Sequence, residues 1–263
     1  MDAYITGFLV SCKGIPATVF VSVLSVAIGS VVGLLIALMR TSKNKFLSGI
    51  SKLYVDIVRG TPMLVQALIF AYGIPEFIQT HLFYFKWANL IIPAIIVCGL
   101  NSAAYMSEVI RSGIQAVDKG QMEAARSLGM SKTMAMRLII IPQAVKIILP
   151  AVGNEFVTLI KETSVLSYVG VHEILRKGTL LSAATFEAFP AYIGVALAYL
   201  LLTLPLSKLI AVLERRGKGS EKKIGEEKKD AEHPRGHLQA FGLAALLKYQ
   251  NLRIARNREQ NAI

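Results

Sequence analysis

The chain has 263 residues, of which 54% are hydrophobic and 17% are charged, and its mean hydropathy is +0.52. These values exclude an ordinary soluble domain of this length. The net charge of +12 does not indicate nucleic-acid binding, because the basic residues lie in links between apolar stretches and in the C-terminal tail, with no aromatic-interleaved basic motif. Cys12 and Cys98 are too few for a disulfide framework, and we interpret both as packing residues.

The first apolar run, residues 15–39, is longer than the apolar region of a signal peptide and predicts a first membrane span. Arg40 and Lys43 follow it, which places its end in the cytoplasm and the N-terminus outside. Gly29 and Gly33 allow another helix to approach closely. Ordinary helix packing is the favoured interpretation of this pair, and a dimer contact is the alternative.

The second span is expected over residues 53–78. Pro62 lacks a backbone donor and restricts Thr61, so the carbonyl groups freed there need a partner or a water-lined cavity. A kink beside a solute pathway and a purely structural kink are both consistent with this proline. Gln66, one turn later, favours a polar lining and is a pathway candidate.

The third span is expected over residues 88–110. Asn101 lies deep within it and is a second pathway candidate. Near its inner end Glu108 and Arg111 are spaced i,i+3, which favours a structural ion pair over a role in binding a solute.

A charged and punctuated stretch, residues 118–150, separates this span from the next. Asp118 can cap a short helix, with Gln121 completing a capping box, and Gly129 can end it in a left-handed conformation. About ten residues give a helix roughly 15 Å long.

One side of this short helix is expected to be nearly bare at Ala124 and Ala125, so that a partner could contact the backbone, with Glu123 and Arg126 at the edges. Ser131 can cap a second short helix. That helix is expected to stop before a proline, Pro142.

The fourth span, about residues 147–170, carries a polar wedge. On a helical wheel five side chains fall within one arc of about 120°: Asn154, Glu155, Thr158, Lys161 and Glu162. A wedge at membrane depth must face a cavity, a pathway or another subunit. A buried ion-pair cluster and direct contact with a solute both remain open, and the two signs of charge suit an amino acid.

The link over residues 171–187 carries charges of both signs and is expected to be an outer loop, either solvated or part of a surface for an external partner. A fifth span follows over residues 188–213 and ends in the cytoplasm. The Gly-, Lys- and Glu-rich residues 217–236 are expected to be disordered, and residues 238–256 could form a basic amphipathic helix on the membrane surface. The tail shows no family likeness and carries no predicted function.

Several collinear motifs resemble those of the permease subunits of ABC importers, and specifically the polar amino-acid permease family. The likeness covers about residues 10–215. The motifs are Arg59-Gly60-Thr61-Pro62-Met63-Leu64-Val65-Gln66, Asn101-Ser102-Ala103-Ala104-Tyr105, Gly120-Gln121 leading to Glu123-Ala124-Ala125 and Gly129, and Lys161-Glu162-Thr163-Ser164.

The resemblance implies an all-α integral membrane protein with about five transmembrane helices in the type I ABC importer permease fold. It implies a transmembrane domain over residues 1–216 with a coupling loop at 112–146, and a tail at 217–263. Contacts with an ATPase would fall on Glu123, Ala124, Ala125 and Gly129. The implied partners are two cytoplasmic ATPase subunits, a second permease copy or a paralogue, an external amino-acid-binding protein and the bilayer of the bacterial cytoplasmic membrane.

The sequence lacks a Gly-x-x-x-x-Gly-Lys-Ser/Thr loop, so ATP is expected to bind to the partner ATPase, and no cofactor is expected in this chain. Its four histidines show no metal-ligand spacing, and no hydrolase motif is present, so catalysis by this chain alone is not expected. A permease for another small solute and a non-transporting membrane scaffold are the alternative functions.

Overall fold

The computed structural model describes residues 2–230, and side chains as far as residue 215. Every regular element in this part of the chain is a helix, which confirms the all-α prediction. The elements are α1 (Asp2–Cys12), α2 (Ile15–Arg40), α3 (Lys45–Gly60), α4 (Met63–Leu68), η1 (Ile69–Gly73), α5 (Ile74–His81), α6 (Ile91–Gln115), α7 (Lys119–Ser127), α8 (Lys132–Ala135), η2 (Met136–Ile140), α9 (Ile141–Glu162), η3 (Thr163–Val169), α10 (Ile174–Thr185) and α11 (Ala188–Asp230). The chain divides after Glu214 into two units.

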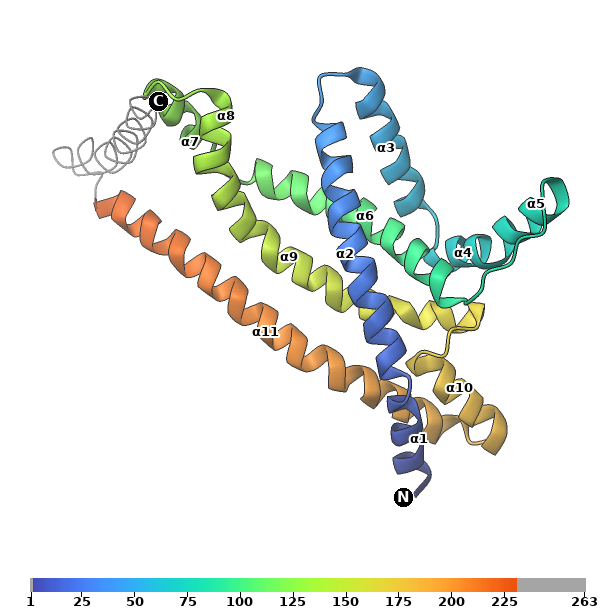
Figure 1. Ribbon diagram of the computed structural model, residues 1–263. Coiled ribbons are helices and arrows are strands. Elements are labelled where there is room, and N and C mark those ends of the chain that lie inside the picture. The colour runs from blue at the N-terminus through green and yellow to red at the C-terminus, as the bar shows by residue number, and fades with distance from the viewer. Residues whose placement is uncertain (1, 231–263) are drawn as a thin grey trace, which may run out of the picture. The chain divides into compact units, whose positions relative to one another are not determined.

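Five helical stretches within residues 2–230 are long and apolar enough to cross a membrane, as predicted: Asp2–Arg40, Met63–His81, Ile91–Gln115, Lys132–Val169 and Ala188–Arg215. The first and third run in the same direction, because Gly29 lies against Ser102 and Gly33 lies against Met106. The C-terminal ends of α2 and α6 therefore lie on the side of the bundle that carries α7 (Figure 1). We call this the α7 side.

The contact between α2 and α6 depends on glycine. A Cβ atom on Gly29 would lie 2.7 Å from Ser102 Oγ, and one on Gly33 would lie 2.6 Å from Met106 Cβ. Both distances are shorter than van der Waals contact, so the two helices approach as closely as they do only because these side chains are absent. The favoured interpretation, helix packing within the chain, is confirmed.

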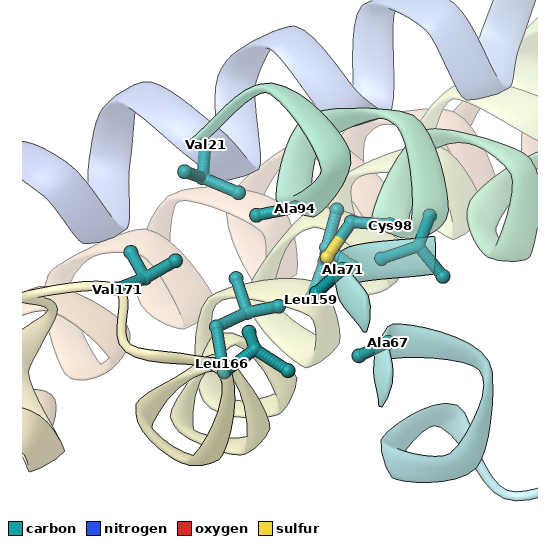
Figure 2. Close-up of a cluster of buried hydrophobic side chains, with 10 residues drawn as sticks. Val21, Ala67, Ala71, Ala94, Cys98, Leu159, Leu166 and Val171 are labelled. Carbon is teal, nitrogen blue, oxygen red and sulfur yellow. The ribbon is translucent and has the colours of Figure 1, made fainter. Parts of the chain in front are cut away.

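A core of small and branched apolar side chains joins α2, α4, η1, α6, α9 and η3 (Figure 2). Ala67, Ala71 and Ala94 in this core are at most 4% exposed, and Leu159 and Leu166 are fully buried. Figure 2 shows Leu159 and Leu166 directed between the helices that carry Cys98 and Ala71. The alanines let the helices approach, and the leucines fill the space between them.

The second span is shorter than the predicted residues 53–78, because the chain breaks before it. Helix α3 ends at Gly60, Thr61 and Pro62 are extended, and α4 begins at Met63. Residues 53–60 therefore belong to α3. The cause is Pro62, whose ring disfavours a helical conformation at Thr61.

The prediction that the second short helix stops before Pro142 is wrong. Helix α8 continues through the π-helical turn η2 into α9, so the chain is helical without interruption from Lys132 to Glu162. In η2 the Ile141 N–H donates to the Met136 carbonyl, five residues back. This wider turn accommodates a proline that lacks an N–H group and would clash with the carbonyl four residues earlier.

The same arrangement occurs at the second span, where the π-helical turn η1 precedes Pro75. Within the predicted coupling loop at residues 112–146, residues 116–131, which include α7, lie between α6 and the long helix that begins at Lys132.

The link over residues 171–187 is not a solvated loop, because it forms helix α10 and buries its first acidic residue. Glu173 is fully buried and caps α10, with its carboxylate accepting the N–H groups of Leu175 at 2.7 Å and Arg176 at 2.6 Å. The Tyr199 hydroxyl of α11 donates to the same carboxylate at 2.7 Å. Burial raises the pKa of Glu173, and these hydrogen bonds oppose the shift only in part.

Helix α11 extends to Asp230, so the prediction of disorder from residue 217 is wrong for residues 217–230. The composition explains this, because Glu and Lys are good helix formers as well as common residues of disordered segments. The remainder of that segment and the predicted amphipathic helix at 238–256 lie outside the described residues.

Candidate functional site

Helix α7 is fixed at its start by its predicted cap. The Asp118 Oδ1 atom accepts the Gly120 N–H at 2.9 Å. Gln121 donates its backbone N–H to the Asp118 carbonyl at 3.0 Å, but its side chain makes no bond back to Asp118 among the described hydrogen bonds. The N-terminal cap is therefore confirmed, while the reciprocal half of the capping box is not formed.

Helix α7 ends in a Schellman motif around Gly129, which has a φ of +82° as the prediction of a left-handed residue requires. The Met130 N–H donates to the Ala125 carbonyl at 3.1 Å, and the Gly129 N–H donates to the Arg126 carbonyl at 3.0 Å. The Arg126 guanidinium closes the turn by donating from Nη1 to the Met130 carbonyl at 3.0 Å. The turn is thus held by three hydrogen bonds.

The two alanines of α7 face opposite ways, which corrects the prediction that both present a bare side to a partner. Ala125 is 1% exposed and packs on Met130 and Ala135 in a small core of the loop itself. Glu123, Ala124 and Gly129 are exposed. A Cβ atom on Gly129 would have no neighbour within 4 Å, so the outer surface of α7 is open at its C-terminal end.

Ser131 caps the next helix as predicted, since its hydroxyl accepts the Met134 N–H at 3.2 Å. The cap begins the continuous helix that carries the polar wedge. One helix, which contains the π-helical turn η2, therefore connects the loop around α7 with the wedge.

The polar wedge of α9 is accessible rather than closed by ion pairs. Asn154 and Lys161 are exposed, and Glu155, Thr158 and Glu162 are half-buried. Lys161 forms an ion pair with neither Glu155 nor Glu162, both of which lie in the described part of the chain. The chain by itself does not form the buried ion-pair cluster that was one interpretation of this pattern.

The other two pathway candidates hold the break before α4. The Gln66 Nε2 atom donates to the Val58 carbonyl and to Thr61 Oγ1, both at 2.8 Å. Asn101 is 4% exposed and donates from Nδ2 to the Gln66 Oε1 atom at 3.1 Å. Gln66 thus supplies a partner for a carbonyl group near the proline break, as a structural kink requires. The structure brings Gln66 and Asn101 together.

Glu108 is the centre of an arginine cluster that sequence reasoning found only in part. The predicted pair is present, with Arg111 Nη2 2.7 Å from Glu108 Oε2. Arg40 at the end of α2 also pairs with Glu108, and Arg59 Nη1 of α3 lies 4.0 Å from it. The sequence does place an arginine within the last two residues of α2 and of α3. Only the packing of the helices shows that these two arginines converge on Glu108.

Metal binding finds no support in the described residues, where no three His, Cys, Asp or Glu side chains are placed to share an ion. Among the predicted site residues, exposed side chains occur on the outer surface of α7, at Glu123 and Ala124, and in the polar wedge of α9, at Asn154 and Lys161.

The sequence and the fold match known transport proteins. The model of the family "binding-protein-dependent transport system inner membrane component" matches residues 29–218. The chain is 36% identical over 211 residues to the probable amino-acid permease protein YxeN of Bacillus subtilis, covering 80% of this chain and 92% of that protein. It is 36% identical over 213 residues to the putative glutamine transport system permease protein GlnP of Rickettsia prowazekii, covering 81% of this chain and 95% of that protein.

Among solved structures, an amino acid ABC transporter crystallised with histidines matches with a TM-score of 0.70 and 40% identity, covering 82% of this chain and 94% of that chain. The MetNI methionine ABC transporter in an inward-facing conformation matches with a TM-score of 0.60 and 16% identity, covering 78% of this chain and 94% of that chain. At this identity the likeness concerns the fold alone. The chain belongs to the family of binding-protein-dependent transport system inner membrane components.

Proposed function

We propose that the chain is the membrane-spanning permease subunit of an ATP-driven importer of a polar amino acid. The relatives named as amino-acid and glutamine permeases support the substrate class. The observation that carries the proposal is the exposed surface of α7, with Glu123 and Ala124 outward beside the open turn at Gly129. A short rigid helix with a bare surface on the end of a membrane bundle is suited to docking a second protein.

The partner at this surface is an ATPase subunit on the cytoplasmic side, which places the N-terminus of the permease outside. The ATPase binds the ATP, and this chain needs no cofactor. The complete transporter in the bacterial cytoplasmic membrane holds two ATPase subunits, a second permease copy or a paralogue, and an external protein that delivers the amino acid. Because Ala125 anchors α7 to Met130 and Ala135, closure of the ATPases moves α7 and its loop as one body.

The loop transmits this movement to α9, which is continuous with α8. The α9 wedge then changes its access from one side of the membrane to the other. Lys161 and the carboxylates of Glu155 and Glu162 are not paired with one another, so they are available to the carboxylate and ammonium groups of an amino acid. Asn154 and Thr158 add uncharged hydrogen-bonding groups to the same surface.

The direct test is uptake of labelled amino acids into vesicles that contain the permease with its ATPase and binding protein, with and without internal ATP. We expect ATP-dependent uptake of a polar amino acid. Lys161→Gln should raise KM about tenfold or more, because a hydrogen bond to a charged group contributes about 1.5–3 kcal/mol. Lys146→Gln is the matched control, since Lys146 is an exposed lysine on the same helix but outside the wedge.

Each alternative predicts a different result. A stable complex that hydrolyses ATP but takes up no amino acid would indicate another small solute. A permease that binds no ATPase would indicate a scaffold and would contradict the assignment of α7. If Lys146→Gln and Lys161→Gln have the same effect on KM, the wedge does not contact the solute.

A further inference from the structure

A cavity of about 730 Å³ opens at the end of the bundle opposite the α7 side. One wall contains Tyr72 of η1 with Pro75, Glu76 and Gln79 of α5, and the other consists of residues 85–90 in the link between α5 and α6. This link lies away from α7 because α6 runs from it toward the α7 side (Figure 1). Pockets of about 300–1,000 Å³ are typical of sites for drug-sized ligands.

The two walls of the cavity are held in place by hydrogen bonds. The Trp87 Nε1 atom donates to the Phe70 carbonyl of η1 at 2.9 Å and so ties one wall to the other. The Tyr72 hydroxyl donates to the Val169 carbonyl of η3 at 3.1 Å. The Phe85 ring meets the Trp87 ring edge to face, with 4.9 Å between their centroids. The cavity is therefore preformed, which lowers the entropy cost of binding a ligand.

The backbone of the link is unpaired along the cavity. The link runs back along α5, since the Phe83 N–H donates to the Ile78 carbonyl and Trp87 reaches Phe70. Residues 84–88 belong to no helix or strand, and no hydrogen bond in the described part of the chain uses their backbone N–H or C=O groups. Lipid offers no partners to such groups, so they face water or a protein.

The cavity also offers unpaired charges and aromatic surface. Glu76 and Lys86 are exposed on opposite walls, and neither forms an ion pair with a residue in the described part of the chain. The half-buried rings of Phe85 and Trp87 present apolar surface between these charges. A ligand that carries both apolar and charged side chains suits this lining.

A peptide in an extended conformation uses every one of these features, because its backbone can pair with an unpaired segment and its side chains can use the pockets beside it. A free amino acid would use the charges but would leave most of residues 84–88 unpaired. A helix of a second permease copy has its own backbone groups already bonded and could not pair with them.

We propose that this cavity binds an extended peptide segment of a protein on the side of the membrane opposite α7. The backbone of the peptide pairs with residues 84–88, an apolar side chain packs on Phe85 and Trp87, and a basic side chain meets Glu76. The site uses no residue of the α7 surface or of the α9 wedge, so it does not depend on the identity of the transported solute.

The test is selection from a peptide library by the permease, reconstituted with its ATPase in phosphatidylcholine nanodiscs. The library contains acetylated pentapeptide amides with lysine or glutamine at the central position and varied residues elsewhere. Retained peptides are identified by mass spectrometry. We expect retention of peptides that place an apolar residue beside the lysine.

A second library carries N-methyl groups on alternate backbone nitrogen atoms, which removes donors without changing the side chains. We expect its retention to be at least about tenfold lower, because each lost hydrogen bond lowers affinity about fivefold. This comparison separates backbone pairing from binding by side chains alone.

Two variants test the charge in the cavity. Glu76→Gln should lower the retention of lysine peptides relative to glutamine peptides about two- to fivefold, the range for an exposed ion pair. Glu187→Gln is the matched control, since it removes an exposed carboxylate from the other link at this end of the bundle, outside the cavity, and should change nothing. Folding of each variant is checked by its recovery as a complex with the ATPase.

Five results would overturn the proposal. The first is retention no greater than by empty nanodiscs, and the second is equal retention of the two libraries. The third is an equal effect of Glu76→Gln and Glu187→Gln. The fourth is displacement of the peptides by free amino acids at matched ionic strength, which would identify an amino-acid site. The fifth is carbodiimide crosslinking of Lys86 to a second permease copy, which would show that this copy covers the cavity.

Discussion

The turn at Gly129 offers a sharp test of how α7 acts, because the geometry separates backbone strain from packing. The φ of +82° is one that L-residues adopt at a cost of about 1–2 kcal/mol, whereas a Cβ atom there would meet nothing within 4 Å. Gly129→Val therefore changes the conformation of the turn without a clash. Such a cost lowers the population of the native turn about 5- to 30-fold relative to alternatives.

We expect Gly129→Val to insert into the membrane normally and to lose most ATP-driven uptake, since the turn and its hydrogen bonds rearrange. Gly129→Asn should retain uptake, because Asn tolerates the left-handed conformation better than other non-glycine residues. Gly120→Ala is the control on the same helix, where a Cβ atom would lie 3.4 Å from Asp118 Oδ1, in ordinary contact.

The assay measures uptake and ATP hydrolysis in parallel on reconstituted complexes. Loss of uptake with continued hydrolysis in Gly129→Val would indicate that the two activities are uncoupled. Equal uptake by the Val and Asn variants would refute the argument, because it would show that the left-handed turn is not needed for coupling.

Three further substitutions test the fold around the site. Glu173→Gln should lower Tm in detergent, because an amide cannot accept all three bonds and an unsatisfied buried donor costs about 1–3 kcal/mol. Burial raises the pKa of Glu173 in the folded protein. The stability that this side chain contributes is therefore fully present below its unfolded pKa of about 4.3, and it declines as the pH rises through the higher folded pKa. Acidification should therefore raise the Tm of the wild type relative to Glu173→Gln, and a difference in Tm that does not change with pH would contradict this. Gly33→Ala should destabilise the protein by about 1–3 kcal/mol, because its Cβ atom would lie 2.6 Å from Met106 Cβ, whereas Gly49→Ala, with open space around it, should not. Gln66→Leu should lower Tm by leaving the Val58 carbonyl without its side-chain donor, with KM for the solute unchanged; a raised KM at unchanged Tm would instead assign Gln66 to the pathway.

The sequence by itself predicts those features that depend on neighbouring residues. The number of spans follows from the length of each apolar run, and the start and end of α7 follow from Asp118 and Gly129. The break after α3 follows from Pro62. In each case the physical cause lies within a few residues of the feature that it produces. The causes are a cap, a left-handed turn, a missing N–H group and a run of apolar side chains.

The tertiary structure decides the features that depend on residues far apart in the chain. A helical wheel cannot show that Ala125 faces the interior of its own loop while Ala124 faces outward, because the direction depends on where Ala135 returns. Burial of Glu173 likewise depends on Tyr199, and the charge at Glu108 depends on helices that only folding brings beside α6. Local pattern fixes the caps, the left-handed turn and the number of apolar spans, whereas the environment of a charged or small side chain is set by the helices that pack around it.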